Sequence, residues 1–156
     1  MACPFIRTNW TKEEENRMNE LEEKLFLLAK DHLADAYSPY SHFHVASALV
    51  TDAGEIFTGV NIENSSFGLT NCAERTAIFS WVNAGRPGKI KCLLIIGNTD
   101  RPISPCGACR QVMSEFMAPE TEVILTDSQG DYERFTVEQL IPYHFTEKDI
   151  QDGANK

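Results

Sequence analysis

The sequence predicts an α/β fold, a three-layer α/β/α sandwich with a central mixed sheet of about five strands. Segments with apolar residues three and four positions apart, typical of helices, alternate along the chain with short apolar runs typical of strands. One of these runs, residues 91–97, is almost entirely apolar, as expected for a strand covered on both faces. With 156 residues, 42% of them hydrophobic, the chain suits a single domain over residues 1–156.

The first predicted element is a long amphipathic helix over residues 11–36. Its apolar positions recur every three and four residues, with Glu and Lys between them. Thr11 and Glu14 resemble a capping box, which starts a helix. Because proline disfavours helical geometry in the residue before it, we expect the helix to end before Pro39.

A hairpin and a second helix are predicted next. Strands over residues 44–50 and 56–63 flank a short turn that contains Asp and Gly. Residues 73–84 have helical spacing, and Gly85 with Pro87 just beyond it closes this helix.

The C-terminal half continues with strand and helix patterns. After the apolar strand, the expected elements are a helix, a strand, a short edge strand and a short helix, over residues 107–117, 122–127, 131–135 and 136–141. The helices are expected to cross over the central strands. The termini, residues 1–10 and 146–156, are expected to be loosely ordered.

Charge and cysteine content argue against several classes of protein. A formal net charge of −9 would repel a phosphate backbone, so we expect no nucleic-acid partner. No stretch approaches the ~18 apolar residues that cross a bilayer, and no export signal is visible, so we expect a cytoplasmic protein without a membrane partner. Five cysteines in such a chain indicate metal binding or catalysis rather than a disulfide framework.

Three of the cysteines lie at the starts of two predicted helices. Cys106 and Cys109 form a C-x-x-C pair, which alone is also compatible with a redox couple or with buried structural thiols. Cys72 begins the preceding helix, and the 34 positions up to Cys106 suffice for an excursion that returns the chain beside its start. Helix N-termini favour thiolates, so three thiolates at one point predict a zinc site whose fourth position is left to water. None of the four histidines has a metal-type spacing with these cysteines.

Glu74 and Arg75 follow the first of these cysteines. A side chain in the first turn of a helix leans toward the N-terminus, so Glu74 can reach a water on the metal, take its proton and pass it to a substrate nitrogen. Acidic residues are also common in first turns because they complement the helix dipole, and Arg75 is equally compatible with a surface position. We expect Glu74 to be catalytic, and Arg75 to donate to the sulfurs and offset the charge of three thiolates.

Four segments between residues 37 and 145 resemble, in the same order, the short-chain, homotetrameric type of the zinc-dependent cytidine/deoxycytidylate deaminase family. They read YSPYSHFHVASAL, GVNIENSSFGLTNCAERTAIF, SPCGACRQVMSEF and TVEQLIPYHF. The pattern C-A-E followed by P-C-x-x-C is the three-cysteine form of the nucleobase deaminase signature. The resemblance implies one Zn²⁺ per subunit on Cys72, Cys106 and Cys109, with Glu74 as proton shuttle and Arg75 beside the thiolates.

The resemblance also implies a nucleoside site. Asn61 and Glu63 would bind the ribose, and Phe43 would pack on the base. Main-chain groups of Ala73 and Ser104 would contact the pyrimidine.

Two further expectations concern the geometry of this site. Asn61 and Glu63 are two positions apart in a predicted strand, so both side chains are expected on one face, with Ile62 turned into the core. Homotetramers of the family place an aromatic residue near the C-terminus in a neighbour's site, and Phe145 stands at that place. The sequence departs from the family at residues 45–48, which read V-A-S-A in place of the common V-G-A-A.

The implied function is hydrolytic deamination of cytidine and deoxycytidine to uridine and deoxyuridine with release of ammonia, a reaction of pyrimidine salvage. A deaminase of a cytosine-nucleoside antibiotic of the blasticidin type would keep the zinc motif but use other groups in place of Asn61 and Glu63. A non-catalytic zinc-binding module would keep the cysteines without needing Glu74. At the level of sequence, these are the alternatives to a free-nucleoside deaminase.

Overall fold

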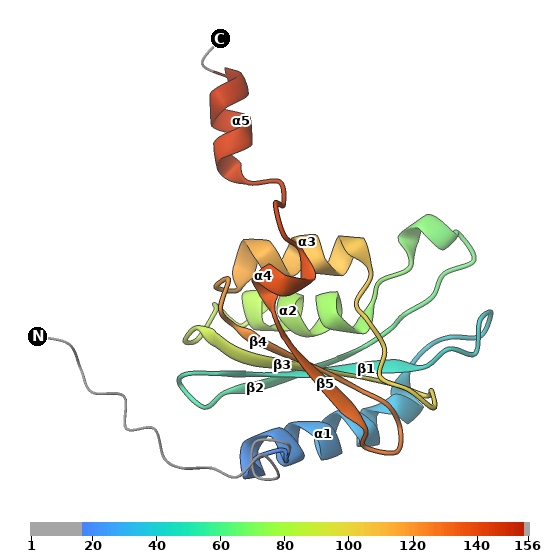
Figure 1. The fold of residues 1–156 in the computed structure, drawn as a ribbon. Coiled ribbons are helices and arrows are strands. Elements are labelled where there is room, and N and C mark those ends of the chain that lie inside the picture. The colour runs from blue at the N-terminus through green and yellow to red at the C-terminus, as the bar shows by residue number, and fades with distance from the viewer. Residues whose placement is uncertain (1–16, 155–156) are drawn as a thin grey trace, which may run out of the picture.

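A five-stranded sheet forms the middle layer of the computed structural model, which describes residues 17–154 (Figure 1). Its order is β2-β1-β3-β4-β5. The strands are β1 (Val45–Thr51), β2 (Ile56–Val60), β3 (Ile90–Gly97), β4 (Glu122–Thr126) and β5 (Tyr132–Thr136). The β3–β4 pair is parallel, whereas the β1–β2, β1–β3 and β4–β5 pairs are antiparallel. The predicted mixed sheet is confirmed.

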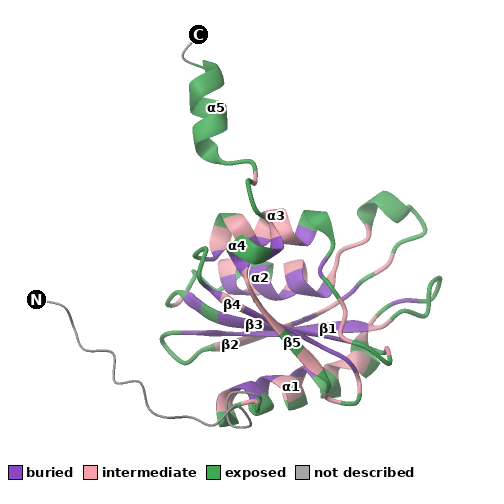
Figure 2. Cartoon of the chain, in the orientation of Figure 1, coloured by how far each residue is buried: buried purple, intermediate pink, exposed green. Residues whose placement is uncertain are grey.

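Helices cover both faces of this sheet, as the predicted three-layer sandwich requires (Figure 1). Helix α1 (Glu20–His32) lies on one face, and α2 (Ala73–Asn83), α3 (Gly107–Phe116) and the short α4 (Val137–Leu140) lie on the other. Figure 2 shows that the central strands are buried over most of their length. Strand β3 is covered on both sides, because Leu93 and Ile95 pack in the core under α2 and α3, while Leu94 and Ile96 pack toward α1.

Helix α1 starts later than the sequence predicts. Residues 17–19 are not helical, and Asn19 caps the helix by accepting hydrogen bonds from the N–H groups of Leu21 and Glu22. The side chain of Glu22 in turn accepts from the N–H of Asn19 at 2.8 Å, which completes a capping box. The predicted capping box of Thr11 and Glu14 lies outside the described residues.

Strand β2 is shorter than predicted, and this changes where its last residues face. Its pairing with β1 ends at Val60, after which Ile62 makes isolated bridges to Tyr37 and Asn71. Ile62 is 45% exposed and Asn61 is 8% exposed, so the expectation that Ile62 faces the core is wrong. The main-chain N–H of Asn61 still donates to the carbonyl of Val45, but the N–H of Val45 donates to the Asn61 side chain, whose amide in turn donates to the carbonyl of Phe43. The buried side chain thus takes over part of the strand pairing where the chain leaves the sheet.

A further helix, α5 (Glu147–Ala154), occupies most of the segment expected to be a loosely ordered tail. The sequence pattern did not predict it. It extends away from the other helices and strands and is exposed along its whole length (Figures 1 and 2). Among the described helices, none combines the length and the apolar character needed to cross a membrane.

Candidate active site

Two helices begin beside each other and bring three cysteines together. Cys72 is the N-cap residue of α2 and Cys106 is the N-cap residue of α3, yet neither side chain forms a capping hydrogen bond. Cys109 lies in the first turn of α3. The sulfurs of Cys72 and Cys106 are 3.9 Å apart, and the three sulfur atoms all lie within 4.8 Å of one another. The predicted convergence of two helix N-termini is therefore present.

The spacing and chemistry of these sulfurs fit zinc. A tetrahedral centre with Zn–S bonds of about 2.3 Å places two sulfurs about 3.8 Å apart, close to the separation of Cys72 and Cys106. Cys109 is buried while Cys106 is exposed, so one side of the cluster faces solvent. Within residues 17–154 no fourth His, Cys, Asp or Glu joins the group. Three protein ligands with one open position are typical of catalytic rather than structural zinc.

The charge around the sulfurs favours a cation. Hydrogen bonds from Cys109 and from Arg75 lower the pKa of Cys72 to about 5. The hydrogen bond from Cys109 to Cys72 also raises the pKa of Cys109 above its ordinary value, because the proton on the Cys109 sulfur stabilises the Cys72 thiolate. The Nη2 of Arg75 donates to the Cys72 sulfur at 3.4 Å. Zinc binds deprotonated cysteines, so metal binding would release the remaining protons.

Glu74 lies directly beside this cluster in the first turn of α2. Glu74 is only 4% exposed, which is unusual for a carboxylate. Burial raises the pKa of Glu74 to about 7, and the negative charge at Cys72 adds to the effect. A carboxyl group with a pKa near 7 exchanges its proton readily at neutral pH, which suits a general acid and base.

The main chain holds a second group of predicted residues next to Cys72. The N–H of Glu63 donates to the carbonyl of Tyr37, and Ile62 exchanges two main-chain hydrogen bonds with Asn71. Because Asn71 immediately precedes Cys72, the segment that carries Asn61 and Glu63 borders the cysteine cluster.

Asn61, Glu63 and Phe43 meet through the loop that precedes β1. The Asn61 side chain accepts from the N–H of Val45 at 2.9 Å and donates to the carbonyl of Phe43 at 2.7 Å. The Glu63 carboxylate accepts hydrogen bonds from the hydroxyl and the N–H of Ser41 and from the N–H of Tyr40. The hydrogen bond from the Ser41 hydroxyl lowers the pKa of Glu63. The Phe43 side chain is 42% exposed and stays accessible beside these two groups.

Comparison with known proteins identifies the family. The family described as the cytidine and deoxycytidylate deaminase zinc-binding region matches residues 19–125, which contain all three clustered cysteines. The chain belongs to this deaminase family. It is 48% identical over 117 residues to a cytidine deaminase of Halalkalibacterium halodurans, covering 75% of this chain and 88% of the relative. It is 45% identical over 134 residues to a cytidine deaminase of Sporosarcina psychrophila, covering 86% and 98%.

Solved structures agree with this assignment to the deaminase family. A cytidine deaminase from Burkholderia pseudomallei is 49% identical and superimposes with a TM-score of 0.77, covering 82% of this chain and 100% of the other. A cytidine deaminase from Mycobacterium tuberculosis is 32% identical with a TM-score of 0.69, covering 80% and 96%. The deaminase fold predicted from the sequence is thus confirmed, and the family supplies zinc as the metal for the cysteine cluster.

The remaining predicted site residues of this deaminase lie in two different places: two are close in sequence to the clustered cysteines, and one is far from them. Ala73 is the first residue of α2 and is fully buried, and Ser104 lies two residues before Cys106. Phe145 lies elsewhere, beyond α4, where it is 61% exposed and its carbonyl accepts from Gln111 Nε2 at 2.9 Å. It lines a cavity of about 640 Å³ that is formed by the end of α3, α4 and the start of α5, and this cavity contains none of the other predicted site residues.

Two residues of the deaminase site were not singled out by the sequence. Gly59 in β2 lies so close to α2 that a Cβ at this position would come within 2.4 Å of Ala77 N and 2.5 Å of Ala73 O. A glycine inside a strand pattern often marks such a close approach and was the available signal. Arg110, which follows Cys109 directly, forms two hydrogen bonds to the turn before Cys106 and one to the end of α4. Its position after a metal-ligand motif was its only signal.

Proposed function

We propose that this protein is a zinc-dependent cytidine deaminase that converts cytidine and deoxycytidine to uridine and deoxyuridine with release of ammonia. The observation that carries the proposal is the buried carboxyl group of Glu74 beside three clustered cysteines. The names of relatives at 45–48% identity over most of the chain support the choice of cytidine. A non-catalytic zinc module is disfavoured because it has no use for a buried carboxyl group beside the metal.

The metal site in this proposal consists of Cys72, Cys106 and Cys109, which hold one Zn²⁺ per subunit. When bound, zinc acts as a Lewis acid that lowers the pKa of a water molecule toward 7. Arg75 donates to the Cys72 sulfur and so reduces the negative charge of the three thiolates, which otherwise weakens that acidity.

Glu74 moves the protons of the reaction. Its carboxylate takes one proton from the attacking water and delivers it to N3 of the cytosine, while a C–O bond forms at C4. It then takes the second proton of that water and delivers it to the amino group, so that the C4–N bond breaks and ammonia leaves. The raised pKa of Glu74, about 7, favours both the acceptance and the return of each proton.

The nucleoside is bound by the group of residues that borders the cysteine cluster. Asn61 and Glu63 bind the ribose, and Phe43 packs on the base. Main-chain groups of Ala73 and Ser104 contact the pyrimidine. The exposed ring of Phe43 beside the Glu63 carboxylate supports this division between sugar and base. An antibiotic-type deaminase is disfavoured because an amide and a carboxylate at these positions suit a sugar diol.

The decisive experiment follows the absorbance change from cytidine to uridine with wild type and Glu74→Gln, each at measured zinc content. We expect conversion by wild type and a rate lower by about 10²- to 10⁴-fold or more in zinc-loaded Glu74→Gln, since proton transfer by a positioned group contributes that much. Absence of conversion by fully zinc-loaded wild type would overturn the cytidine assignment. Full activity of the zinc-loaded variant would overturn the role of Glu74.

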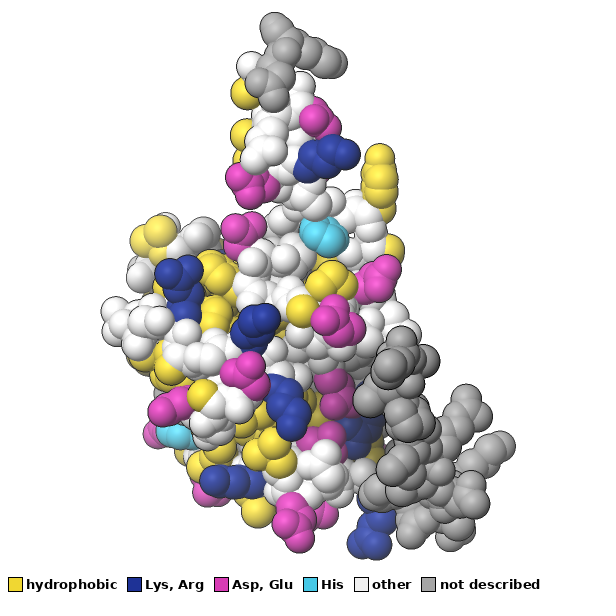
Figure 3. All heavy atoms as spheres, turned by 90° about the vertical axis from the view of Figure 1, so that its left-hand side faces the viewer, with side chains coloured by type: hydrophobic (Ala, Val, Ile, Leu, Met, Phe, Trp, Pro, Cys, Tyr) yellow, Lys and Arg dark blue, Asp and Glu magenta, His cyan; other side chains and the backbone are white. Residues whose placement is uncertain are grey.

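We further propose that the enzyme is a cytoplasmic homotetramer that acts in pyrimidine salvage on free nucleosides. The exposed helix α5, together with exposed apolar residues at Tyr143, Phe145 and Ile150, supports assembly, because such groups usually pack against a partner. On the face drawn in Figure 3, basic side chains are interspersed with acidic ones rather than gathered in a stripe. This pattern and the net charge of −9 argue against a nucleic-acid substrate.

A further inference from the structure

The side chain of Arg110 connects three segments of the chain at the metal-binding turn. Its Nε donates to the carbonyl of Pro105 at 2.9 Å, its Nη1 donates to the carbonyl of Leu140 at 2.6 Å, and its Nη2 donates to the hydroxyl of Ser104. One guanidinium group thus joins the residues before Cys106, the end of α4 and its own helix α3. The guanidinium is suited to this because its five N–H donors point in fixed, divergent directions.

The turn that Arg110 holds has few other hydrogen bonds, although Pro105 is buried. In the described part of the chain, residues 100–105 make no hydrogen bond between main-chain groups. Beyond the bonds from Arg110, the carbonyl of Arg101 accepts from Thr99 Oγ1 at 2.7 Å, and Ile103 packs against the core. The two residues immediately before Cys106 therefore depend on Arg110 for their polar contacts.

The two cysteines of the C-x-x-C pair are held in different ways. Cys109 is fully buried inside α3 and is fixed by the packing of that helix. Cys106 is exposed at the N-cap position, where the direction of its side chain depends on the path of the preceding residues. The separation of these two sulfurs is therefore set by whatever fixes residues 104 and 105.

We propose that Arg110 is a positioning residue, which holds the turn of Ser104 and Pro105 so that Cys106 presents its sulfur at the distance zinc requires. This inference rests on the zinc ligands of the proposed function and adds a residue that touches neither metal nor substrate. The role depends on the forked shape of the side chain and not only on its charge. Lysine has a single ammonium group and cannot reach the two acceptors in the turn and the third acceptor at the end of α4 at once.

The test measures how fast zinc leaves the purified holoenzyme into an excess of chromogenic chelator. Arg110→Lys and Arg110→Gln are both expected to release zinc about 10- to 100-fold faster than wild type, the usual effect of removing a group that orients a metal ligand. A second readout replaces zinc with Co²⁺ and records the sulfur-to-metal charge-transfer band, which reports the sulfur geometry. This band is expected to shift in both variants. Release at the wild-type rate with an unshifted band would overturn the proposal, as would restoration of the slow rate by lysine.

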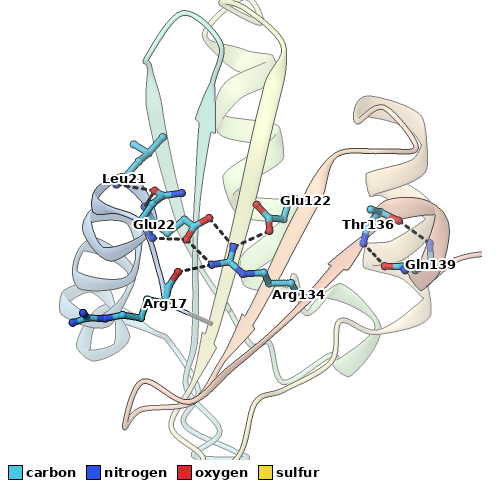
Figure 4. Close-up of polar contacts among 8 residues, drawn as sticks. Arg17, Leu21, Glu22, Glu122, Arg134, Thr136 and Gln139 are labelled. Atoms are coloured by element: carbon cyan, nitrogen blue, oxygen red, sulfur yellow. Dashed lines mark hydrogen bonds and ion pairs between the residues drawn. The ribbon is translucent and has the colours of Figure 1, made fainter. Parts of the chain in front are cut away.

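Arg134→Gln is the matched control. Arg134 is also an arginine with several hydrogen bonds, but its partners are Glu22, Glu122 and the carbonyl of Arg17, on the α1 side of the sheet (Figure 4). This variant should be destabilised yet release zinc at the wild-type rate. If Arg134→Gln released zinc as fast as the Arg110 variants do, the effect of Arg110 would be explained by lower overall stability, and the proposal would be overturned.

Ser104→Ala keeps the proposal testable if the Arg110 variants do not fold. Ser104 is exposed, so the substitution removes one acceptor of Arg110 without opening a cavity in the core. Zinc release several-fold faster than in wild type is expected, and an unchanged rate would overturn the role of this turn. Wild-type protein that holds no zinc would instead overturn the proposed function, so the two failures are distinguishable.

Discussion

Glu22 is a buried carboxylate of α1 that Arg134 of β5 binds through two nitrogens (Figure 4). The two Glu22 oxygens lie 2.6 and 2.7 Å from these nitrogens, and Arg134 also contacts Glu122 at 2.7 Å. Burial alone would raise the pKa of Glu22, but hydrogen bonds from Arg134 and from the N–H of Asn19 outweigh it, so the pKa lies below its ordinary value. The contact fastens α1 to the edge of the sheet.

We predict that Glu22→Gln lowers the free energy of unfolding at pH 7 by about 1–3 kcal/mol, because Arg134 loses a charged partner. The pKa of Glu22 is lower in the folded than in the unfolded chain, so its stabilisation is complete above the ordinary value of 4.5 and is lost as the pH falls through the folded pKa. Urea unfolding at pH 7 and at about pH 3 measures this effect. The difference between wild type and variant should shrink at the lower pH, and a constant difference would contradict the assignment.

At the scale of single residues, the sequence predicted what is local and missed what is distant. Cys72, Glu74 and the C-x-x-C pair were predictable because their geometry follows from positions in the first turns of two helices. Arg110 was not, because its role depends on a contact with Leu140, 30 residues away, which no local pattern in the sequence indicates. The orientation of Ile62 was predicted wrongly because strand periodicity was extended past the point where β2 leaves the sheet.

At the scale of elements, the contact between β2 and α2 positions the first turn that carries Cys72 and Glu74. Gly59 makes this contact possible, since any Cβ there would overlap main-chain atoms of α2. We predict that Gly59→Ala costs about 1–3 kcal/mol of stability and weakens zinc binding, because the strand and the helix must separate. Thermal unfolding and zinc content measure the two effects. Gly107→Ala is the control for stability, since a Cβ at this first position of α3 meets no atom within 4 Å. Equal stability of Gly59→Ala and wild type would contradict the prediction.

The elements themselves were predicted well where burial imposes a periodicity. Within residues 17–154, every strand and every helix that packs on the sheet was expected, and apart from the start of α1 their ends differ by a few residues. The start of α1 was misplaced because the sequence offers two polar capping patterns, and the described helix uses Asn19 with Glu22. Helix α5 was missed because none of its residues is buried, so it has no core-facing stripe in this chain.

At the scale of the whole molecule, one chain does not bring all the predicted site residues together. The cysteines, Glu74 and the Asn61–Glu63 segment border one another, whereas Phe145 lies apart from them, by a cavity beyond α4. The sequence can predict a layered sheet from one chain because its strands and helices bury one another. It cannot place a residue whose partner is another copy, because the contact leaves no periodic pattern.

The proposed homotetramer makes a prediction that separates action within a chain from action between chains. If Phe145 completes the site of a neighbouring subunit, Phe145→Ala should lower activity roughly 30-fold. This corresponds to a loss of about 2 kcal/mol of interaction free energy, as expected for an aromatic residue at the centre of an interface. Glu74→Gln should lose most of its activity for a different reason, because it lacks the carboxyl group that moves the protons. When the two variants are unfolded together and reassembled, some sites combine an intact Glu74 from one chain with an intact Phe145 from another. Activity should then exceed the sum of the two variants assembled separately. If Phe145 acts only within its own chain, every mixed site remains defective and mixing restores nothing, which would leave α5 and its neighbours as an assembly surface without a part in the chemistry.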